Sequence, residues 1–432
     1  MLAQEARALL TRLARVQSFA LQEAMLPAAN LLPEAQTAIE RVLAQGRREL
    51  RARTEGYLRW LHSPAARRAD TEEAHRRFIF LRLRFNGVLN QFDLFNDVIT
   101  QRSENDIGVW LSGLDVVSAD ALALPGGYYQ APPVICYLDR GLGAAIRRAR
   151  TRLPGGAENP VAVIRVPRER MIGHGIASSL IHEVGHQAAA LLDLVNSLRP
   201  MLQGLQRSNG PARLPWQLWE RWISEIVADF WSVARVGVAS TLGLMGVVGL
   251  PRPFVFRING NDPHPPPWIR VKVSCAIGRA LYPHPQWDRV EALWDAYYPL
   301  LGFDPSRTRL LTRLQDHVPA FVGLLINHRP RCLRGRSLIE VLDIDRRQPA
   351  RLQALFLGWR RHPRQLYRAP PSLVFAVLGQ ARFDGHLSPE DESRLIGKLL
   401  AHWALRSTLD VSAACARRSP RQSLPQPAIS IR

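Results

Sequence analysis

The segment SSLIHEVGHQ, residues 178–187, places two histidines and a glutamate in a stretch that is otherwise almost wholly apolar or small. We expect one helix from about Ile176 to Leu198, and apolar residues on most of its surface predict that it is buried. Ionisable side chains in a buried helix are costly unless partners satisfy them. Gly185 costs about 1 kcal/mol in a helix interior, which indicates a closely packed neighbour. The segment therefore requires a core that surrounds this helix and a partner for its polar groups.

His182 and His186 can supply that partner together by binding a metal ion. Residues four apart share one face of a helix, so the two imidazoles can converge on a single cation. Glu183 is about 100° from His182 around the helix, beside the metal position, where it can accept a proton from water. This is the arrangement of the H-E-x-x-H zinc motif. The motif needs a third ligand to be convincing.

The best candidate for the third ligand lies in SEIVADFW, residues 224–231. Pro215 opens a second predicted helix that is rich in tryptophan, and Glu225 and Asp229 share one face of it. Glu225 would complete a His₂Glu set, which in catalytic zinc sites leaves one position open. Asp229 could accept a hydrogen bond from the far nitrogen of a ligating histidine and fix its tautomer.

Two alternatives to this ligand set remain open from the residues alone. The two carboxylates could instead form ordinary ion pairs with Arg221 or Arg235, and Glu220 competes with Glu225 as the ligand. Another class of site is excluded, because a metzincin needs Gly and His where the chain has Ala189 and Leu192.

A third motif gives the chain a family resemblance. HPPPWIRV, residues 264–271, follows HEVGH and EIVAD in order. The three together resemble the HtpX and CAAX-prenyl-protease group of zinc metallopeptidases, which carries HExxH, E-x-x-A-D and then H-P-P-x-x-x-R-[IV]. His264, Pro265, Pro266, Arg270 and Val271 match the last of these, and the resemblance covers about residues 175–275.

The resemblance implies a zinc-dependent metalloendopeptidase of the gluzincin type acting on a peptide or protein substrate. His182, His186 and Glu225 would bind Zn²⁺ and Glu183 would be the general base. His264 and Arg270 would lie near the cleft as catalytic groups that contact the substrate or the developing oxyanion, or would only brace the structure. The alternatives are a catalytically silent zinc-binding scaffold, a polyanion-binding protein that uses the basic residues 304–432, and a zinc hydrolase that does not act on peptides. A strand at residues 161–167 could pair its edge with an extended peptide, as in zincin-like architectures.

The remaining sequence predicts a mostly α fold with a small β-sheet (α+β). PPVICYLDRG (132–141) and NPVAVIRVP (159–167) are short β-branched runs that predict strands, and loops are expected at 150–159 and 199–214. We therefore expect an N-terminal helical region (1–104), a zincin-like catalytic domain (105–303), a C-terminal helical region (304–414) and a disordered tail (415–432). Ser388 is the expected N-cap of a helix in the third region.

Charge and hydropathy bear on the partners. The chain of 432 residues has a net charge of +20, yet Lys272 and Lys398 are its only lysines, so a general bias toward arginine accounts for much of the charge. Residues 304–432 hold 22 Lys and Arg against 10 Asp and Glu, so a polyanion-binding surface, if one exists, belongs there. No aromatic-rich basic motif accompanies it, and a nucleic-acid partner is not expected.

Membrane insertion is not expected either. The apolar run Val236–Leu250 has 15 residues, fewer than the roughly 20 that cross a bilayer, so we expect it to be buried in the core. The N-terminus has no apolar signal segment, and the four cysteines form no CxxC motif, so a cytoplasmic protein with reduced thiols is expected.

Cys136 is an alternative thiolate ligand for the metal.

Overall fold

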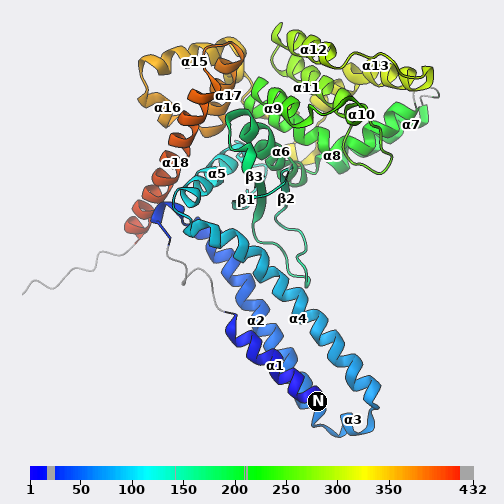
Figure 1. The fold of residues 1–432 in the computed structure, drawn as a ribbon, viewed down its shortest axis with the longest axis vertical. Helices are drawn as coiled ribbons and strands as arrows, with labels where there is room; N and C mark the ends of the chain where they lie inside the picture. The colour runs from blue at the N-terminus through cyan, green and yellow to red at the C-terminus, as the bar shows by residue number, and fades with distance from the viewer. Residues whose placement is uncertain (17–24, 142, 209, 211–212, 419–432) are drawn as a thin grey trace, which may run out of the picture.

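The computed structural model describes residues 1–16, 25–141, 143–208, 210 and 213–418. Most of the described residues are helical, and the strands among them form one small sheet. This confirms the expected mostly α fold with a small β-sheet (Figure 1). Within them, no helix combines the length and the apolar character needed to cross a membrane.

The N-terminal region forms an elongated arm of helices (Figure 1). Its members are α1 (Leu2–Arg15), α2 (Pro33–Leu61), α3 (Pro64–Arg68) and α4 (Thr71–Thr100), with α3 at the tip. α4 begins where Asp70 accepts a hydrogen bond from the Glu73 N–H at 2.6 Å, which satisfies an otherwise free donor of the first turn. The core of the arm continues onto one face of the sheet.

The sheet has the strand order β1-β3-β2, with β1 at Val134–Asp139, β2 at Ala145–Arg147 and β3 at Ala162–Pro167. β1 and β3 are parallel, and β2 pairs with β3 in the antiparallel sense. Val163 packs into the core of the arm, whereas Ile164 packs into the main core on the opposite face. Burial on both faces explains why β1 and β3 are continuous β-branched runs. The two long strands were predicted, and the short, exposed β2 was not. The expectation that strand 161–167 offers its edge to a peptide is wrong, because β3 pairs with β1 on one side and with β2 on the other.

Helices α5 (Asn105–Leu122), α6 (Gly173–Leu191), α8 (Arg213–Val236) and α11 (Pro267–Leu281) build the centre of the molecule. The expected helix 176–198 was predicted with the wrong C-terminal end. α6 stops at Leu191, Asp193 takes a left-handed conformation (φ 49°), and α7 (Leu194–Ser208) follows.

The expected loop 199–214 is also wrong, because α7 continues through Pro200. A proline inside a helix costs about 3 kcal/mol. Leu194, Leu198 and Leu202 offset this cost by burying one helical face, since each is at most 3% exposed. Residues 209, 211 and 212 of this expected loop lie outside the described residues.

Most of the apolar run Val236–Leu250 is a core helix, as expected, but Val236 ends α8, and Leu250 follows the helix and is 43% exposed. The helix is α9 (Val238–Val248), and Gly237 separates it from α8 by adopting a positive φ of 59°, which is accessible to glycine. Seven residues of α9 are buried.

The C-terminal region shares its core with the central helices. α13 (Pro305–Asn327) places the Phe321 ring parallel to the Trp219 ring of α8, 4.8 Å away. α17 (Pro371–Phe383) packs on α8 and α9, and α18 (Pro389–Arg418) packs on α5. The remaining helices are α10 (Arg252–Val255), α12 (Gln286–Tyr297), α14 (Leu338–Val341), α15 (Pro349–Arg361) and α16 (Arg364–Arg368).

Ser388 is the N-cap of α18, as expected, since its hydroxyl accepts the Asp391 N–H at 3.1 Å. Four residues of the expected disordered tail, 415–418, are the last turn of α18, and the rest of the tail lies outside the described residues.

Candidate metal centre

The site is built where α6 and α8 touch backbone to backbone. A Cβ placed on Gly185 would lie 2.8 Å from the Ala228 carbonyl oxygen, 2.9 Å from the Ala228 Cα and 3.1 Å from the Trp231 Cβ. Only glycine permits this approach, so the close neighbour expected from Gly185 is α8 itself. The contact lies between His182 and His186 on one helix and just after Glu225 on the other, which brings the three side chains together.

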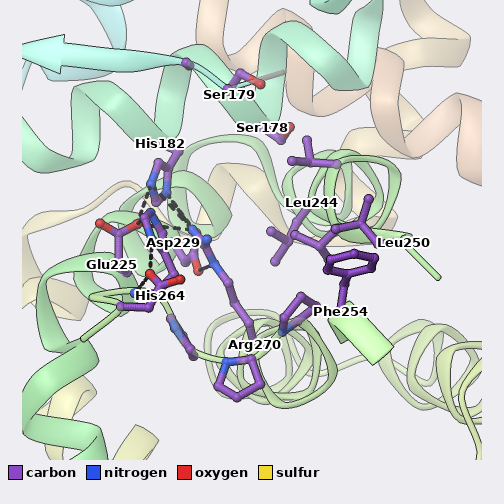
Figure 2. A pocket seen from close by; sticks show the side chains of 18 of the residues that line it. Ser178, Ser179, His182, Glu225, Asp229, Leu244, Leu250, Phe254, His264 and Arg270 are labelled. Atoms are coloured by element: carbon purple, nitrogen blue, oxygen red, sulfur yellow. Dashed lines mark hydrogen bonds and ion pairs between the residues drawn. The ribbon is translucent and has the colours of Figure 1, made fainter. Parts of the chain in front are cut away.

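His182 and Glu225 line a cavity of about 490 Å³, whereas His186 is not one of its lining residues (Figure 2). Glu183 and Arg270 belong to the polar part of its lining. An apolar wall lies across the cavity from His182. It consists of Leu244 in α9 and of Leu250 and Phe254 in the segment after it. The cavity is thus a partly apolar cleft with a few convergent polar groups, as is common for binding sites.

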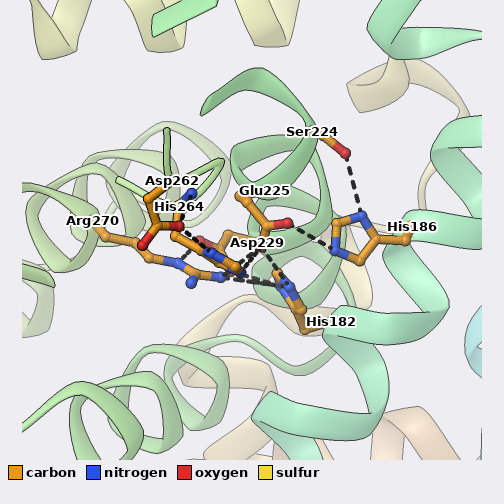
Figure 3. Close-up of polar contacts among 8 residues, drawn as sticks. All are labelled: His182, His186, Ser224, Glu225, Asp229, Asp262, His264 and Arg270. Carbon is orange, nitrogen blue, oxygen red and sulfur yellow. Dashed lines mark hydrogen bonds and ion pairs between the residues drawn. The ribbon is translucent and has the colours of Figure 1, made fainter. Parts of the chain in front are cut away.

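His182, His186 and Glu225 offer nitrogen and oxygen atoms that all lie within 4.8 Å of one another, so this group could hold a metal ion. The His182 Nε2 is 3.2 Å from the Glu225 Oε2, and the His186 Nε2 is 3.4 Å from the Glu225 Oε1 (Figure 3). The residues that the sequence predicts as ligands are therefore brought together.

The Glu225 carboxylate supports a cation at this position. Glu225 is 7% exposed, and its Oε2 is buried without a hydrogen-bond partner among the described residues. Three nitrogens lie within ion-pair distance of this oxygen, from His182 at 3.2 Å, His264 at 3.4 Å and Arg270 at 3.6 Å, but none of them satisfies it as a hydrogen bond. A buried carboxylate oxygen without a donor is costly unless a charge or ligand completes it. The donor set of two imidazoles and one carboxylate suits Zn²⁺.

Asp229 holds His182 in place, as the sequence predicts. The His182 Nδ1 donates to the Asp229 Oδ1 at 2.8 Å, which leaves the Nε2 directed at Glu225. Burial lowers the pKa of His182, but the carboxylates of Asp229 and Glu225 more than offset it and raise the pKa to about 9. Burial raises the pKa of Asp229, yet Arg270 and His182 lower it overall, so its carboxylate stays charged.

Arg270 is paired with Asp229 by two hydrogen bonds. Its Nε donates to the Oδ2 at 2.7 Å and its Nη2 to the Oδ1 at 2.9 Å. Arg270 is 9% exposed, and its Nη2 also lies 3.6 Å from the Glu225 Oε2. Although Arg270 lines the cavity, this two-point pairing favours the bracing role over direct contact with a substrate.

His264 approaches the same carboxylate from an exposed turn. Its Nε2 lies 3.4 Å from the Glu225 Oε2, and its side chain is 51% exposed. On its other side, the ring Nδ1 and the backbone N–H bond the Asp262 Oδ1 at 2.7 and 2.9 Å. Pro266 and Pro267 then start α11, which positions Arg270. The HPPP segment thus holds an imidazole at the mouth of the cleft.

Glu183 lines the cavity beside the histidines. It is 7% exposed, and no hydrogen bond or ion pair joins its carboxylate to another described residue. An acid without such a partner, inside the cleft and one residue from a ligand, is available to exchange protons with a molecule bound there.

Two contacts in this centre were not predicted from the sequence. Ser224 places its hydroxyl 3.5 Å from the His186 Nδ1, and Asp262 orients His264. Ser224 directly precedes the third ligand, and Asp262 stands two residues before the HPP motif, so nearness in sequence is the signal that could have found them.

The alternative ligands do not join the centre. Glu220 accepts hydrogen bonds from Gln203 and Gln206 of α7, at 2.8 and 2.6 Å. Cys136 lies buried on β1 with its sulfur 3.5 Å from the Ser118 hydroxyl, and burial raises the pKa of its thiol. Neither belongs to the group of potential ligands.

Comparisons with known proteins add no evidence about function, so the geometry described above is the basis for the functional proposal. None of the family models, curated proteins or solved structures compared with this chain matches it.

Proposed function

We propose that the chain is a zinc-dependent metallopeptidase. The observation that carries the proposal is the meeting of His182, His186 and Glu225 around a buried carboxylate oxygen that has no hydrogen-bond partner. The resemblance of the three motifs to the HtpX and CAAX-prenyl-protease group supports the same reading. The open cleft beside the ligands, with Glu183 in its wall, gives a substrate access to the centre.

In this proposal Zn²⁺ is held by His182, His186 and Glu225. A bound zinc ion supplies a Lewis acid, which polarises a carbonyl group and makes a neighbouring water more acidic. Asp229 keeps the His182 Nε2 directed at the metal by accepting the Nδ1 proton, and Arg270 keeps Asp229 charged and oriented.

The chain's own groups then move the proton and steady the charge. Glu183 accepts a proton from water as the water attacks the peptide carbonyl, and returns it to the leaving amine. His264, half exposed at the mouth, donates its Nε2–H to the oxygen on which negative charge develops. Its Nδ1 contact with Asp262 fixes the orientation of the ring.

Glu183→Gln tests the general base. The amide has nearly the same shape but accepts no proton at neutral pH, so hydrolysis of a peptide library should stop while one zinc per chain remains. Glu225→Ala tests the metal set and should lose the zinc, measured by elemental analysis of purified protein. Glu72→Gln, at an exposed position in the first turn of α4 near the tip of the arm, is the matched control and should keep both properties.

Three results would contradict parts of this proposal. Full hydrolysis by the Glu183→Gln protein would remove the general base. Equal zinc content in the Glu225→Ala protein would point to another third ligand. Stoichiometric zinc in the wild type without turnover of any peptide would favour the silent zinc-binding scaffold instead.

A further inference from the structure

A second cavity, of about 550 Å³, lies over β2 and β3 where the sheet meets α4. Leu94 and Val163 form part of its apolar lining, and Tyr137 contributes an aromatic ring. The rest of its polar lining consists mainly of guanidinium groups, which belong to Arg147, Arg148, Arg152 and Arg165. We call this cavity the arginine groove.

The arginine groove has more positive charge than its own acids neutralise. Arg147, Arg148 and Arg152 are exposed, and within the described residues no acidic side chain forms an ion pair with any of them. Arg165 contacts Asp139 at the long distance of 3.6 Å, and its Nε is buried without a hydrogen-bond partner. An unmatched cluster of guanidinium groups attracts carboxylates, which they can bind through two parallel hydrogen bonds.

The acids that face the groove are few. Burial raises the pKa of the Tyr137 hydroxyl. The carboxylates of Asp139 on β1 and Asp97 on α4 raise this pKa further, whereas Arg165 and Arg147 lower it, so all four charges lie near the ring. Glu158, whose backbone pairs with that of Arg152, is a third acid, so three acids oppose four arginines. The groove keeps a positive potential even when every acid near it is ionised.

Edge strand β2 leads along the chain from the metal centre to the groove. Gly143 and Ala144 line the cavity of the metal centre, and the next residues, Ala145–Arg147, are β2. β2 is the last strand on its side of the sheet, so its outer backbone groups are open to an added strand. At about 3.3 Å per residue, Arg147 lies roughly 10 Å beyond Ala144 along the strand.

We propose that the arginine groove binds an acidic segment of the polypeptide substrate, about three or more residues from the bond that is cleaved. An extended peptide that leaves the metal centre along β2 reaches the guanidinium groups at that distance. A peptide fits better than a nucleic acid, because an edge strand offers main-chain hydrogen bonds to an extended chain. Single-stranded nucleic acid is usually held by several stacked aromatic rings, and the described lining has one, Tyr137. The inference rests on the proposed function for its substrate role.

The test compares Arg147→Glu/Arg148→Glu with the matched control Arg67→Glu/Arg68→Glu. The control changes the net charge equally, at two exposed positions of α3 at the tip of the arm. The substrates are peptides with four glutamates placed three to six residues from the cleaved bond, on either side, and the same peptides with glutamines. For one of the two placements, wild-type kcat/KM should favour the glutamates on the order of tenfold. The groove variant should lose that preference and the control should keep it.

Binding is measured separately from cleavage, so that the two proposals can fail separately. Fluorescence anisotropy gives the Kd of a labelled glutamate peptide for the Glu183→Gln protein, with and without each charge reversal. Weaker binding in the groove variant alone supports the groove even if no peptide is cleaved, in which case only the hydrolase proposal falls. Equal affinity for glutamate and glutamine peptides overturns the groove proposal. It is also overturned by equal losses in both variants, or by a single-stranded oligonucleotide of equal charge that binds the groove more tightly.

Discussion

The contact at Gly185 makes a quantitative prediction about how zinc binding depends on helix packing. In Gly185→Ala, the new methyl group would be 2.8 Å from one backbone atom of α8 and 2.9 Å from another, whereas ordinary contacts begin at 3.4 Å. The shortfall is about 0.5–0.6 Å, and because both atoms are backbone, relief requires the two helices to move apart. Overpacking of this kind costs about 1–3 kcal/mol. Alanine returns about 1 kcal/mol of helix propensity. The free energy of unfolding of the metal-free protein should therefore fall by about 0–2 kcal/mol.

The same displacement should weaken zinc binding, because it separates the histidines on α6 from Glu225 on α8. Metal–ligand distances tolerate only about ±0.2 Å, so a separation of about 0.5 Å should raise the Kd for zinc on the order of tenfold. Gly397→Ala in α18 is the matched control, since no atom lies within 4 Å of its added methyl group. The control should gain up to about 1 kcal/mol and bind zinc as the wild type does.

The assays are urea unfolding in the presence of EDTA and competition for zinc with a chromophoric chelator. A Gly185→Ala protein that is more stable than the wild type and binds zinc equally well would refute the reasoning. That result would mean that the two helices can separate without moving the ligands.

Three further predictions concern single side chains. Asp229→Asn should weaken zinc binding about 10- to 100-fold in the chelator assay, because His182 loses a charged acceptor and Arg270 its partner; unchanged affinity would contradict this. Asp115→Ala should lower the free energy of unfolding by about 3–5 kcal/mol, because it strands the fully buried Arg102 guanidinium; a loss below about 1 kcal/mol in urea unfolding would argue against it. Burial, aided by Arg382, lowers the pKa of His174 to about 3, so the unfolded chain binds a proton between pH 6.5 and 3 that the folded chain does not. Stability should fall with pH in that window, by about 2 kcal/mol from this group between pH 7 and pH 5. His174→Gln should lose that component in urea unfolding at the two pH values, and an unchanged pH dependence would contradict it.

The metal ligands could be predicted from the sequence because a helix converts spacing into direction. His182 and His186, like Glu225 and Asp229, are four residues apart, so each pair had to share a face once the helix formed. Gly185 added a third clue, since a costly glycine in a buried helix indicates a close neighbour. The parallel strands β1 and β3 could be predicted equally well, because burial on both faces gives an unbroken run of β-branched residues.

What the sequence did not reveal depends on contacts between distant segments. The segment from residue 199, which includes Pro200, was expected to be a loop, although burial of one face of α7 outweighs the cost of the proline. β2 has three residues and little burial, so it has no pattern to detect. The two possible roles of Arg270 differ only in whether its guanidinium meets Asp229, 41 residues away, which spacing cannot decide.

The core shared by α8, α9, α13 and α17 means that the metal motifs, which end near residue 271, do not mark the end of the unit that must fold around them. A polypeptide stopped near residue 304 would retain every ligand and yet leave Trp219 without Phe321 over its face. A premature stop codon or a proteolytic nick in the last third of the chain should therefore behave as a loss of the metal centre itself.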